Sequence, residues 1–341
     1  MGYSKSSIGK LAMVSLLFLG VAFVIILIWS PSFSNVLHSF PLHNSCSLSN
    51  KITLNVSKDD LETALEEASA ENKTLIIAVV NKAYVEGEGR TMLDLFMESF
   101  WLGEGTRPLI DHLLLVAVDQ IAFDRCKFLR LHCYKLVTEG VDFGGEKFFM
   151  SDDFLKMMWR RTLFLADVLK RGYSFIFTDT DVMWLRNPFL RLSNDNSSDL
   201  QISCDKFNGN QWSEANPINT GFYYVRSNNK TIALFDAWYA MKNRSQGMND
   251  QGVLERMKRR GEFRRLGLRV RYMDTVYFSG FCRESRDIRA VTTVHANCCR
   301  SINAKLADLT VVLRDWRKFM SSSNQTLNFH WSTHMACRRS W

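Results

Sequence analysis

The first part of the sequence lacks charged residues. Residues 11–50 contain no Asp, Glu, Lys or Arg, whereas these four types make up 23% of the 341-residue chain. The apolar run at 11–29 is rich in Leu, Ile, Val and Phe. A helix of that length, rising about 1.5 Å per residue, just crosses the hydrocarbon core of a bilayer. We therefore expect one N-terminal transmembrane helix at 11–29.

The residues on either side of this run indicate its orientation. Lys5 and Lys10 precede it, and positively charged flanks stay on the cytoplasmic side of a membrane. A cleaved signal peptide is the alternative, but its apolar part would be shorter and would end in a small-x-small site. This run ends in Trp29 followed by serine and proline. We expect residues 1–10 to form a cytoplasmic tail and 11–29 an uncleaved signal anchor, with the remainder in the lumen.

Other absences narrow the class of protein. The sequence has no CxxC pair, which disfavours a structural zinc site, and it has no internal repeat. Eight cysteines are present, and in an oxidising lumen they can form disulfides, although the sequence does not give their pairing. Buried free thiols are the alternative for some of them. The cysteines are Cys46, Cys126, Cys133, Cys204, Cys282, Cys298, Cys299 and Cys337.

The charge balance and the glycosylation signals agree with a lumenal body. The formal net charge of +8 suits an acidic polysaccharide acceptor, although most such charge is simply solvated surface. A lumenal position and the absence of any nucleic-acid-binding motif argue against nucleic acid as a partner. Six Asn-x-Ser/Thr sequons are also present. They begin at Asn55, Asn72, Asn196, Asn229, Asn243 and Asn324.

The rest of the chain is expected to form a short stem and one large domain. Residues 30–56 are rich in Ser, Asn and Pro and predict the stem, and residues 57–341 predict the domain. In the domain, apolar runs that predict strands alternate with segments that predict helices, a pattern typical of an α/β fold with a mostly parallel central sheet. Strands are expected at 75–80, 113–118, 173–178, 222–225, 269–273 and 291–294, and helices at 57–69, 92–102, 123–129, 153–170, 230–242, 249–260 and 302–308.

Two carboxylates follow the strand expected at 173–178. Asp179 and Asp181 are one residue apart, so in an extended chain their side chains point the same way while Thr180 points elsewhere. Converging carboxylates repel each other unless a positive charge lies between them, and a divalent cation with oxygen ligands suits that place. Because open α/β sheets bind ligands at the carboxyl ends of their strands, the pair predicts a metal-dependent site that handles phosphates. A solvated turn is the alternative.

Six segments in a fixed order give the chain a resemblance to a known family. Together they resemble a plant-type nucleotide-diphospho-sugar transferase of the group around glycosyltransferase family 77, and more distantly the glycogenin-like family 8, over roughly residues 70–320. The resemblance implies a Rossmann-like GT-A fold, a Golgi type II topology and retaining transfer of a sugar from a UDP-pentose or UDP-hexose to a cell-wall polysaccharide or glycoprotein. The six segments are 151–161, 177–188, 204–208, 219–226, 249–252 and 295–300.

The resemblance also implies a metal site. A divalent cation would neutralise the charge that develops on the diphosphate leaving group. Asp179 and Asp181 would hold it, and His295, at the end of a strand-like run, matches the third ligand of the related families. His330 is the competing histidine, and a plain strand-capping role is the alternative for His295. An imidazole among carboxylates favours Mn²⁺ over Mg²⁺.

Further residues that match the family are candidates for binding the nucleotide-sugar. Tyr84 would stack on uracil and Asn81 would hydrogen-bond its edge, an ordinary strand-to-loop transition being the alternative. Thr180, between the two carboxylates, is a further candidate contact. Basic residues on the helix expected at 153–170 match a position near the diphosphate, although they could equally form a solvated helix face. These basic residues are Lys156, Arg160 and Arg161.

The catalytic candidates that the resemblance implies are polar residues later in the chain. Asp250 or Gln251 would stabilise the oxocarbenium-like sugar or position the acceptor, and Asp205 would contact the donor sugar. At a helix start, Asp250 could also be a plain N-terminal cap. The segment from Asn219 to Gly221 is expected to shape a turn beside the site.

Two other functions fit parts of the sequence. A phosphatase of the haloacid dehalogenase type also has an apolar strand followed by Asp-x-Asp, but its motif lies early in the chain and its paired acidic motif follows. Here about half of the chain precedes Asp179, and the acidic pair at 152–153 comes before it. A catalytically silent sugar-binding member of the family would be expected to have lost its metal ligands, and this chain keeps them. We therefore favour the glycosyltransferase.

Overall fold

The expected anchor and stem lie outside the part of the chain that the structure describes. In the described part, no helix is both long enough and apolar enough to span a membrane. Cys46 also lies outside it. The computed structural model describes residues 59–137, 143–147, 150–193, 197–245, 247–322 and 329–340.

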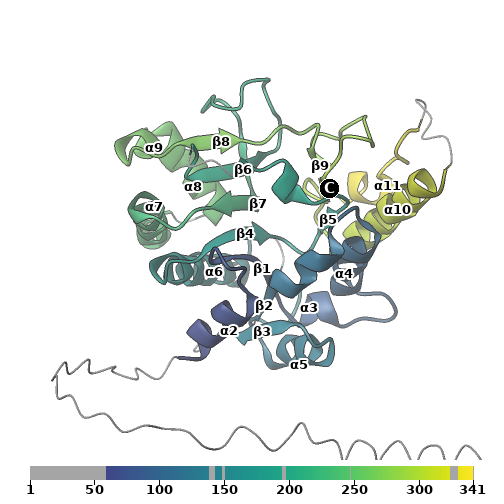
Figure 1. Ribbon diagram of the computed structural model, residues 1–341, viewed down its shortest axis with the longest axis horizontal. Coiled ribbons are helices and arrows are strands. Elements are labelled where there is room, and N and C mark those ends of the chain that lie inside the picture. Colours follow the sequence, from purple (N-terminus) through teal and green to yellow (C-terminus); the bar gives the residue numbers. More distant parts are fainter. Residues whose placement is uncertain are drawn as a thin grey trace, which may run out of the picture. The chain divides into compact units, whose positions relative to one another are not determined.

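A seven-stranded sheet runs through the centre of the molecule (Figure 1). β1 pairs in parallel with β2 and β4, β2 with β3, and β6 with β8, whereas β7 runs antiparallel to both of its neighbours. This mostly parallel sheet confirms the α/β class predicted from the sequence. In spatial order the strands are β3 (His132–Lys135), β2 (Leu113–Ala117), β1 (Thr74–Val80), β4 (Ser174–Thr178), β7 (Ile218–Val225), β6 (Leu200–Cys204) and β8 (Val270–Tyr272).

Helices cover both faces of this sheet because successive side chains of a strand point to opposite faces. Leu75 and Ile77 of β1 enter one core, which α2 (Asp60–Ala68), α6 (Asp152–Lys170), α7 (Asn229–Ala240) and α8 (Asp250–Arg259) complete. Ile76 and Ala78 enter the other, which α4 (Met92–Leu102), α5 (Gln120–Phe128) and α10 (Ile302–Ser321) complete. The shorter helices are α3 (Lys82–Val85), α9 (Glu262–Arg265), α11 (Met335–Arg338), η2 (Arg107–His112), η3 (Pro188–Leu190) and η4 (Lys242–Arg244).

A second, three-stranded sheet lies beside the first. It contains β5 (Val182–Trp184), β10 (Thr293–His295) and β9 (Phe278–Gly280), with β10 in the middle, antiparallel to β5 and parallel to β9. The register of β5 and β10 places His295 opposite Val182. Because β5 begins directly after Asp181, this pairing brings Asp181 and His295 together, although they are 114 positions apart in the chain.

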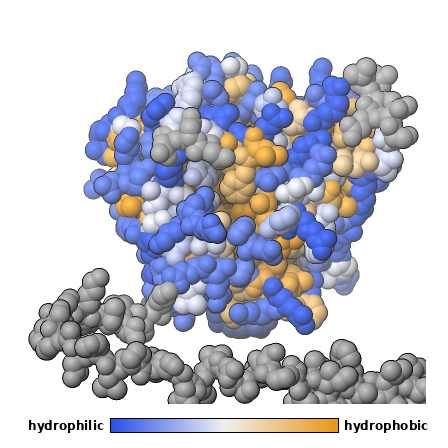
Figure 2. Space-filling view, viewed as in Figure 1, coloured by the Kyte–Doolittle hydropathy of each residue, from blue (hydrophilic) through white to orange (hydrophobic). Residues whose placement is uncertain are grey.

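The expected helices and strands are all present, with two kinds of difference. β3, β5, β6 and β9 were not predicted, because a segment of three to five residues gives only a weak periodic signal, although β2, β4, β8 and β10 of similar length were predicted. The last long helix continues to Ser321, well beyond the expected end at 308. On the face seen in Figure 2, hydrophilic residues dominate and hydrophobic ones gather near the middle.

The structure supplies the cysteine pairing that the sequence left open. Among the described residues, Cys204 is the one cysteine without a disulfide. Burial raises the pKa of its thiol to about 12, which keeps the thiol protonated and unreactive. The three disulfides are Cys126–Cys133, Cys282–Cys298 and Cys299–Cys337.

Residues 329–340 pack back onto α10, and we call them the C-terminal strap. Asp308 and Asp315 of α10 each accept a backbone N–H group of the strap at 2.7 Å. His334 of the strap stacks on Phe281, with the ring centroids 3.8 Å apart. The strap therefore joins α10 to the segment that follows β9.

Stability should fall in acid because of His334. Burial lowers the pKa of this imidazole to about 4 from its ordinary 6.5, and the Glu284 carboxyl 3.4 Å away does not offset this, since burial also raises the pKa of Glu284. The imidazole of His334 therefore takes up a proton near pH 6.5 in the unfolded chain but only near pH 4 in the folded chain. Linkage sets the loss of unfolding free energy over that interval at no more than about 3 kcal/mol.

A variant separates this effect from other titrations. His334→Phe keeps an aromatic ring against Phe281 but cannot take up a proton. In urea unfolding at pH 7 and pH 4, the variant should lose less stability than the wild type, by up to about 3 kcal/mol. Equal losses in both proteins would contradict the prediction.

Candidate active site

A cleft of about 410 Å³ opens at the carboxyl ends of β1, β4 and β6. This is the edge at which open α/β sheets bind ligands. Most of the predicted site residues line this cleft. Those lining it are Asn81, Tyr84, Arg161, Asp179, Thr180, Asp181, Asp205, Asp250, Gln251 and His295.

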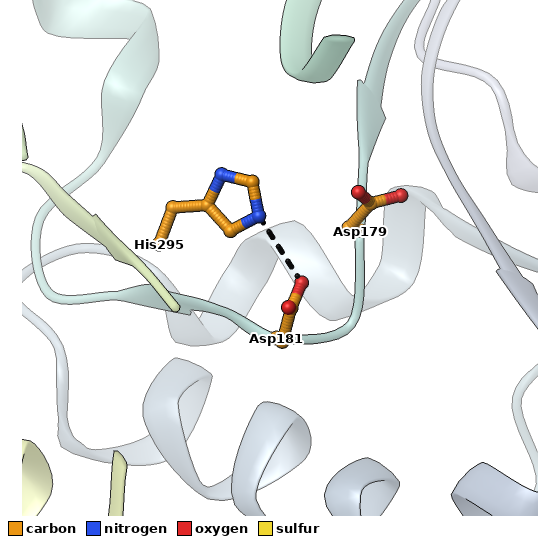
Figure 3. A group of neighbouring side chains, drawn as sticks. All are labelled: Asp179, Asp181 and His295. Carbon is orange, nitrogen blue, oxygen red and sulfur yellow. Dashed lines mark ion pairs between the residues drawn. The ribbon is translucent and has the colours of Figure 1, made fainter. Parts of the chain in front are cut away.

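Asp179, Asp181 and His295 converge on one point of the cleft (Figure 3). One ligand atom from each lies within 4.8 Å of the others, and Nε2 of His295 is 3.4 Å from Oδ1 of Asp181. The sequence predicted that an extended chain would bring the two carboxylates together, but the chain is not extended here. The backbone turns after β4, where the N–H of Val182 donates to the carbonyl of Asp179 at 3.2 Å. This turn and the pairing of β5 with β10 together assemble the group.

Gly221 leaves the space that this group occupies. Its carbonyl accepts the backbone N–H of Asp179 at 2.7 Å. A Cβ at Gly221 would collide with the ring of His295 and would lie 2.9 Å from Oδ2 of Asp179. The glycine therefore permits a close approach of three elements. It lies inside β7, so the turn expected at 219–221 is wrong.

Lys305, which was not predicted, is the second cationic neighbour of Asp181. Its Nζ lies 2.8 Å from Oδ2 of Asp181, while Oδ1 faces His295. Burial alone would raise the pKa of Asp181, but Lys305 and His295 outweigh it and hold that pKa well below its usual range. In return, Asp181 raises the pKa values of both partners above their ordinary values, against burial. Asp181 is thus a permanent carboxylate.

Asp179 has a different electrostatic environment. Burial raises its pKa to about 6, against the opposing charge of Arg161, and the negative charge of Asp181 adds to the rise. Arg161 is shared, since its Nη1 lies 3.1 Å from Asp179 while its Nη2 lies 2.6 Å from Asp250. The guanidinium also packs over the ring of Phe177, 4.7 Å from the centroid. Two neighbouring carboxylates therefore bind protons with very different strength.

Asp250 lines the cleft with its carboxylate and does not cap its helix. The capping residue of α8 is Asn249, whose side chain accepts the N–H of Gly252 at 2.9 Å. The carboxylate of Asp250 instead pairs with Arg161, and its backbone carbonyl accepts the indole N–H of Trp238 at 2.9 Å. The side chain is buried, so its position is fixed by these partners.

Amide side chains surround Asp205 on another wall of the cleft. Its Oδ1 accepts hydrogen bonds from Nδ2 of Asn219 and from Nδ2 of Asn297, each at 2.9 Å. Gln251 is oriented nearby, because its Oε1 accepts the backbone N–H of Thr220 at 3.0 Å. Carboxylates and amides in this arrangement can bind the hydroxyl groups of a sugar.

Asn81 has an unused acceptor. Its Nδ2 donates to the carbonyls of Phe143 at 2.8 Å and Gly145 at 3.2 Å, while its buried Oδ1 has no partner. Such an orphaned acceptor costs about 1–3 kcal/mol until a ligand donor satisfies it. Tyr84, half-buried close by, also lines the cleft, and burial raises its pKa to about 12.

Lys156 and Arg160 do not line the cleft. Lys156 is exposed with Nζ 3.4 Å from Asp153, and Arg160 donates to the carbonyl of Val137 at 2.9 Å. The cleft face of α6 has helical spacing and excludes both positions. That face consists of Phe154, Met157, Met158 and Arg161.

The structure separates the competing histidine from the site and adds two residues that the sequence did not indicate. His330, the competitor of His295, is exposed and does not line the cleft. Lys305 and Asn297 do line it. The available signal was their position: both lie within ten residues of His295, and Lys305 lies in the first turn of a predicted helix. The donor set of two carboxylates and one imidazole could hold a divalent cation.

Comparisons with known proteins identify the family of the chain. Residues 108–309, more than half of the chain, match the family model described as nucleotide-diphospho-sugar transferase. The chain is 59% identical over 288 residues to an uncharacterized protein of Arabidopsis thaliana, At1g28695. The alignment covers 83% of this chain and 84% of that protein. It is 26% identical over 180 residues to the β-arabinofuranosyltransferase RAY1 of the same plant. That alignment covers 52% of this chain and 32% of RAY1.

Among solved structures, mouse xyloside xylosyltransferase 1 aligns with 66% of this chain and 98% of its own, at 12% identity and a TM-score of 0.41. A likeness of that degree says nothing about substrate. The match to the family model identifies the family, and its range of 108–309 includes Asp179, Asp181, His295 and Lys305. The chain therefore belongs to the nucleotide-diphospho-sugar transferase family, and it is a glycosyltransferase.

Proposed function

We propose that this enzyme transfers a pentose or hexose from a UDP-sugar to a cell-wall polysaccharide or glycoprotein, with retention of configuration and with Mn²⁺ held by Asp179, Asp181 and His295. The observation that carries the proposal is the convergence of these three side chains beside Lys305. When bound, the cation would act as a Lewis acid on the diphosphate leaving group. It would also oppose the burial and the repulsion by Asp181 that together raise the pKa of Asp179 to about 6.

The charges of the cleft suit a diphosphate that arrives with a cation. Asp179, Asp181 and Asp250 face Arg161, Lys305 and His295, so the site is close to neutral when the imidazole is protonated. A divalent cation needs the neutral imidazole, and it leaves an excess of one positive charge. The two negative charges of a UDP-sugar offset that excess. Lys305, already directed at the cation ligand Asp181, then contacts the diphosphate oxygens.

The remaining polar groups would handle the sugar. Asp205 and Asn219 orient its hydroxyl groups, and Asp250 with Gln251 stabilises the positive charge that develops on the ring as the bond from the anomeric carbon to the diphosphate breaks. The acceptor hydroxyl oxygen forms the new bond to that carbon, and its proton passes to the departing phosphate oxygen. The diphosphate leaves as UDP.

Asn81 and Tyr84 support uracil as the base. Uracil offers an N3–H donor for the orphaned Oδ1 of Asn81, and its flat face can stack on the ring of Tyr84. The choice of a pentose or hexose follows the names of relatives, of which RAY1 is a β-arabinofuranosyltransferase. The assignment to the family 77 group also remains part of this proposal.

For location, we propose a Golgi membrane protein with the catalytic domain in the lumen. The apolar run at 11–29, the lysines before it and the sequons after it support this. The disulfides also support it, because they persist in oxidising compartments.

Removing one metal ligand should abolish transfer. In the presence of Mn²⁺ the enzyme should release UDP from one member of a panel of UDP-sugars, and chelation should stop it. Asp179→Ala should lower the rate by at least ~100-fold, since even residues that merely support metal ligands often cost 10–100-fold. The control Asp124→Ala removes an exposed carboxylate of α5 and should leave the rate unchanged.

Two results would count against the metal assignment. Asp179→Ala with full activity and normal unfolding would show that the carboxylate holds no essential cation. Calorimetry in which no UDP-sugar binds the wild type in Mn²⁺ would overturn the proposed function as a whole.

The nucleoside contact can be tested separately. Asn81→Ala removes the acceptor for the base, so KM for the UDP-sugar should rise roughly tenfold, the worth of one good hydrogen bond, with a smaller change in kcat. Lys156→Ala, which alters a residue outside the cleft, serves as the control and should change neither constant. An unchanged KM in Asn81→Ala would remove this residue from the nucleoside site.

Topology has its own test. In sealed microsomes that contain the full chain, added protease should leave the domain after residue 30 intact, and detergent should expose it. Digestion of that domain in sealed vesicles would overturn the lumenal position.

A further inference from the structure

Adjacent cysteines fasten the loop that joins the two cationic neighbours of Asp181. His295 ends β10, Lys305 lies in the first turn of α10, and residues 296–301 connect them. Within this loop Cys298 is bonded to Cys282, and the next residue is bonded to Cys337 of the strap. His295 before the loop and Lys305 after it thus both contact Asp181. The middle of the loop is held by two disulfides, one to Cys282 and one to Cys337.

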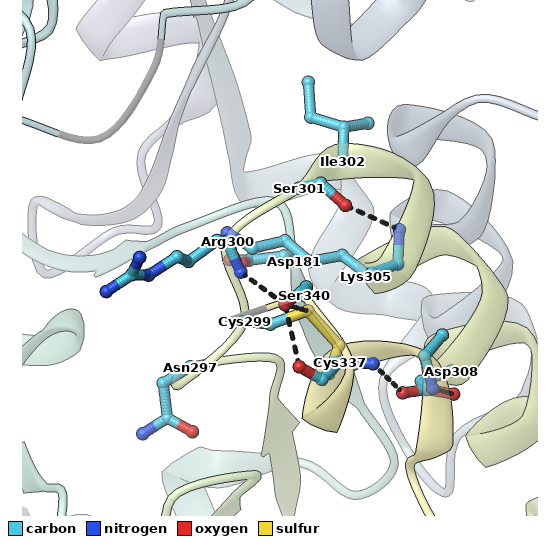
Figure 4. Close-up of a disulfide and its surroundings, with 12 residues drawn as sticks. Asp181, Asn297, Cys299, Arg300, Ser301, Ile302, Lys305, Asp308, Cys337 and Ser340 are labelled. Atoms are coloured by element: carbon cyan, nitrogen blue, oxygen red, sulfur yellow. Dashed lines mark hydrogen bonds and ion pairs between the residues drawn. A yellow bond between two sulfur atoms is a disulfide. The ribbon is translucent and has the colours of Figure 1, made fainter.

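The strap holds the loop and the helix together (Figure 4). Cys337 is buried, its sulfur is bonded to Cys299 of the loop, and its backbone N–H donates to Asp308 of α10 at 2.7 Å. Asp308 lies about one turn beyond Lys305 on that helix. Ser340 adds a second link, because its hydroxyl accepts the backbone N–H of Arg300 at 3.1 Å and donates to the carbonyl of Cys337 at 2.7 Å.

The loop needs such support. Cys298 has a φ of 54°, a left-handed conformation that costs a residue with a side chain about 1 kcal/mol or more. On the cleft side, Oδ1 of Asn297 accepts the N–H of Cys282 at 3.1 Å while its Nδ2 reaches Asp205. The loop is therefore a strained connection that bears on both the diphosphate residues and the sugar residues.

We propose that Cys299, Cys337 and Ser340 are positioning residues that brace this loop against α10, keep both His295 and Lys305 directed at Asp181, and so set the affinity for the donor diphosphate. The ligand in this statement rests on the proposed function, whereas the brace itself does not. Cys337 and Ser340 act through others, since they do not line the cleft, whereas Cys299 lines it and connects them to the loop.

The test compares two ways of losing one disulfide in the full chain. Cys299→Ser with Cys337→Ser should weaken the binding of UDP in Mn²⁺ roughly tenfold, as loss of support for metal ligands does. It should raise KM for the UDP-sugar more than it changes kcat or KM for the acceptor, and amide hydrogen exchange should quicken at 297–302. The control, Cys126→Ser with Cys133→Ser, removes a disulfide that does not line the cleft and should change none of these.

Either of two outcomes would overturn the proposal. One is a folded Cys299→Ser/Cys337→Ser protein that binds UDP and exchanges its loop amides as the wild type does. The other is an equal loss of binding in the control, which would point to stability in general. A wild type that binds no UDP in Mn²⁺ would instead remove the proposed function, and hydrogen exchange would still decide whether the brace exists.

Ser340→Ala keeps the proposal testable if the double variant does not fold. This change keeps all three disulfides and removes only the hydroxyl between Arg300 and Cys337. It should weaken UDP binding several-fold and speed exchange of the Arg300 amide. No change in either measurement would contradict the bracing role.

Discussion

Buried charge in the cleft is the constraint around which the rest of this site is arranged. Carboxylates that lie close together in a protein interior need cations within a few ångströms, and the chain draws these cations from α6, β10 and α10. Every neighbouring feature serves that packing. Gly221 has no side chain and so leaves room for His295 and Asp179, and the pairing of β5 with β10 places the imidazole of His295 beside Asp181. The charged groups are Asp179, Asp181, Asp250, Arg161, Lys305 and His295.

The arrangement gives the two carboxylates of the Asp-x-Asp segment unequal properties. Asp181 has Lys305 on one oxygen and His295 near the other, so it is ionised throughout the physiological range. Asp179 relies on Arg161, which Asp250 also engages, and its pKa remains near 6. The cation proposed for this site would meet one carboxylate that is permanently ionised and one that binds a proton more readily.

Much of the fold could be read from the sequence because its signals are local. The long apolar strands β1, β2 and β4 are buried on both faces and appear as continuous apolar runs, and the helices have clear starts. The short strands β5 and β9 were missed, since three residues show no period of their own, whereas β8 and β10, equally short, were predicted within the segments 269–273 and 291–294. The same reason explains the error at Gly221, which looked like a turn residue and lies in a strand.

The sequence by itself determined the residue types of the site, the strand ends that present them and the family. It also identified the Asp179–Asp181 pair, because an apolar run before two carboxylates is a local pattern. Only the tertiary structure decided the turn that makes them converge, the glycine that makes room, the inclusion of Lys305 and the exclusion of Lys156. It also decided which cysteines pair. The room beside Gly221, the place of Lys305 and the pairing of Cys299 with Cys337 depend on contacts between residues far apart in the chain, and such contacts exist only once the two sheets and α10 have packed together.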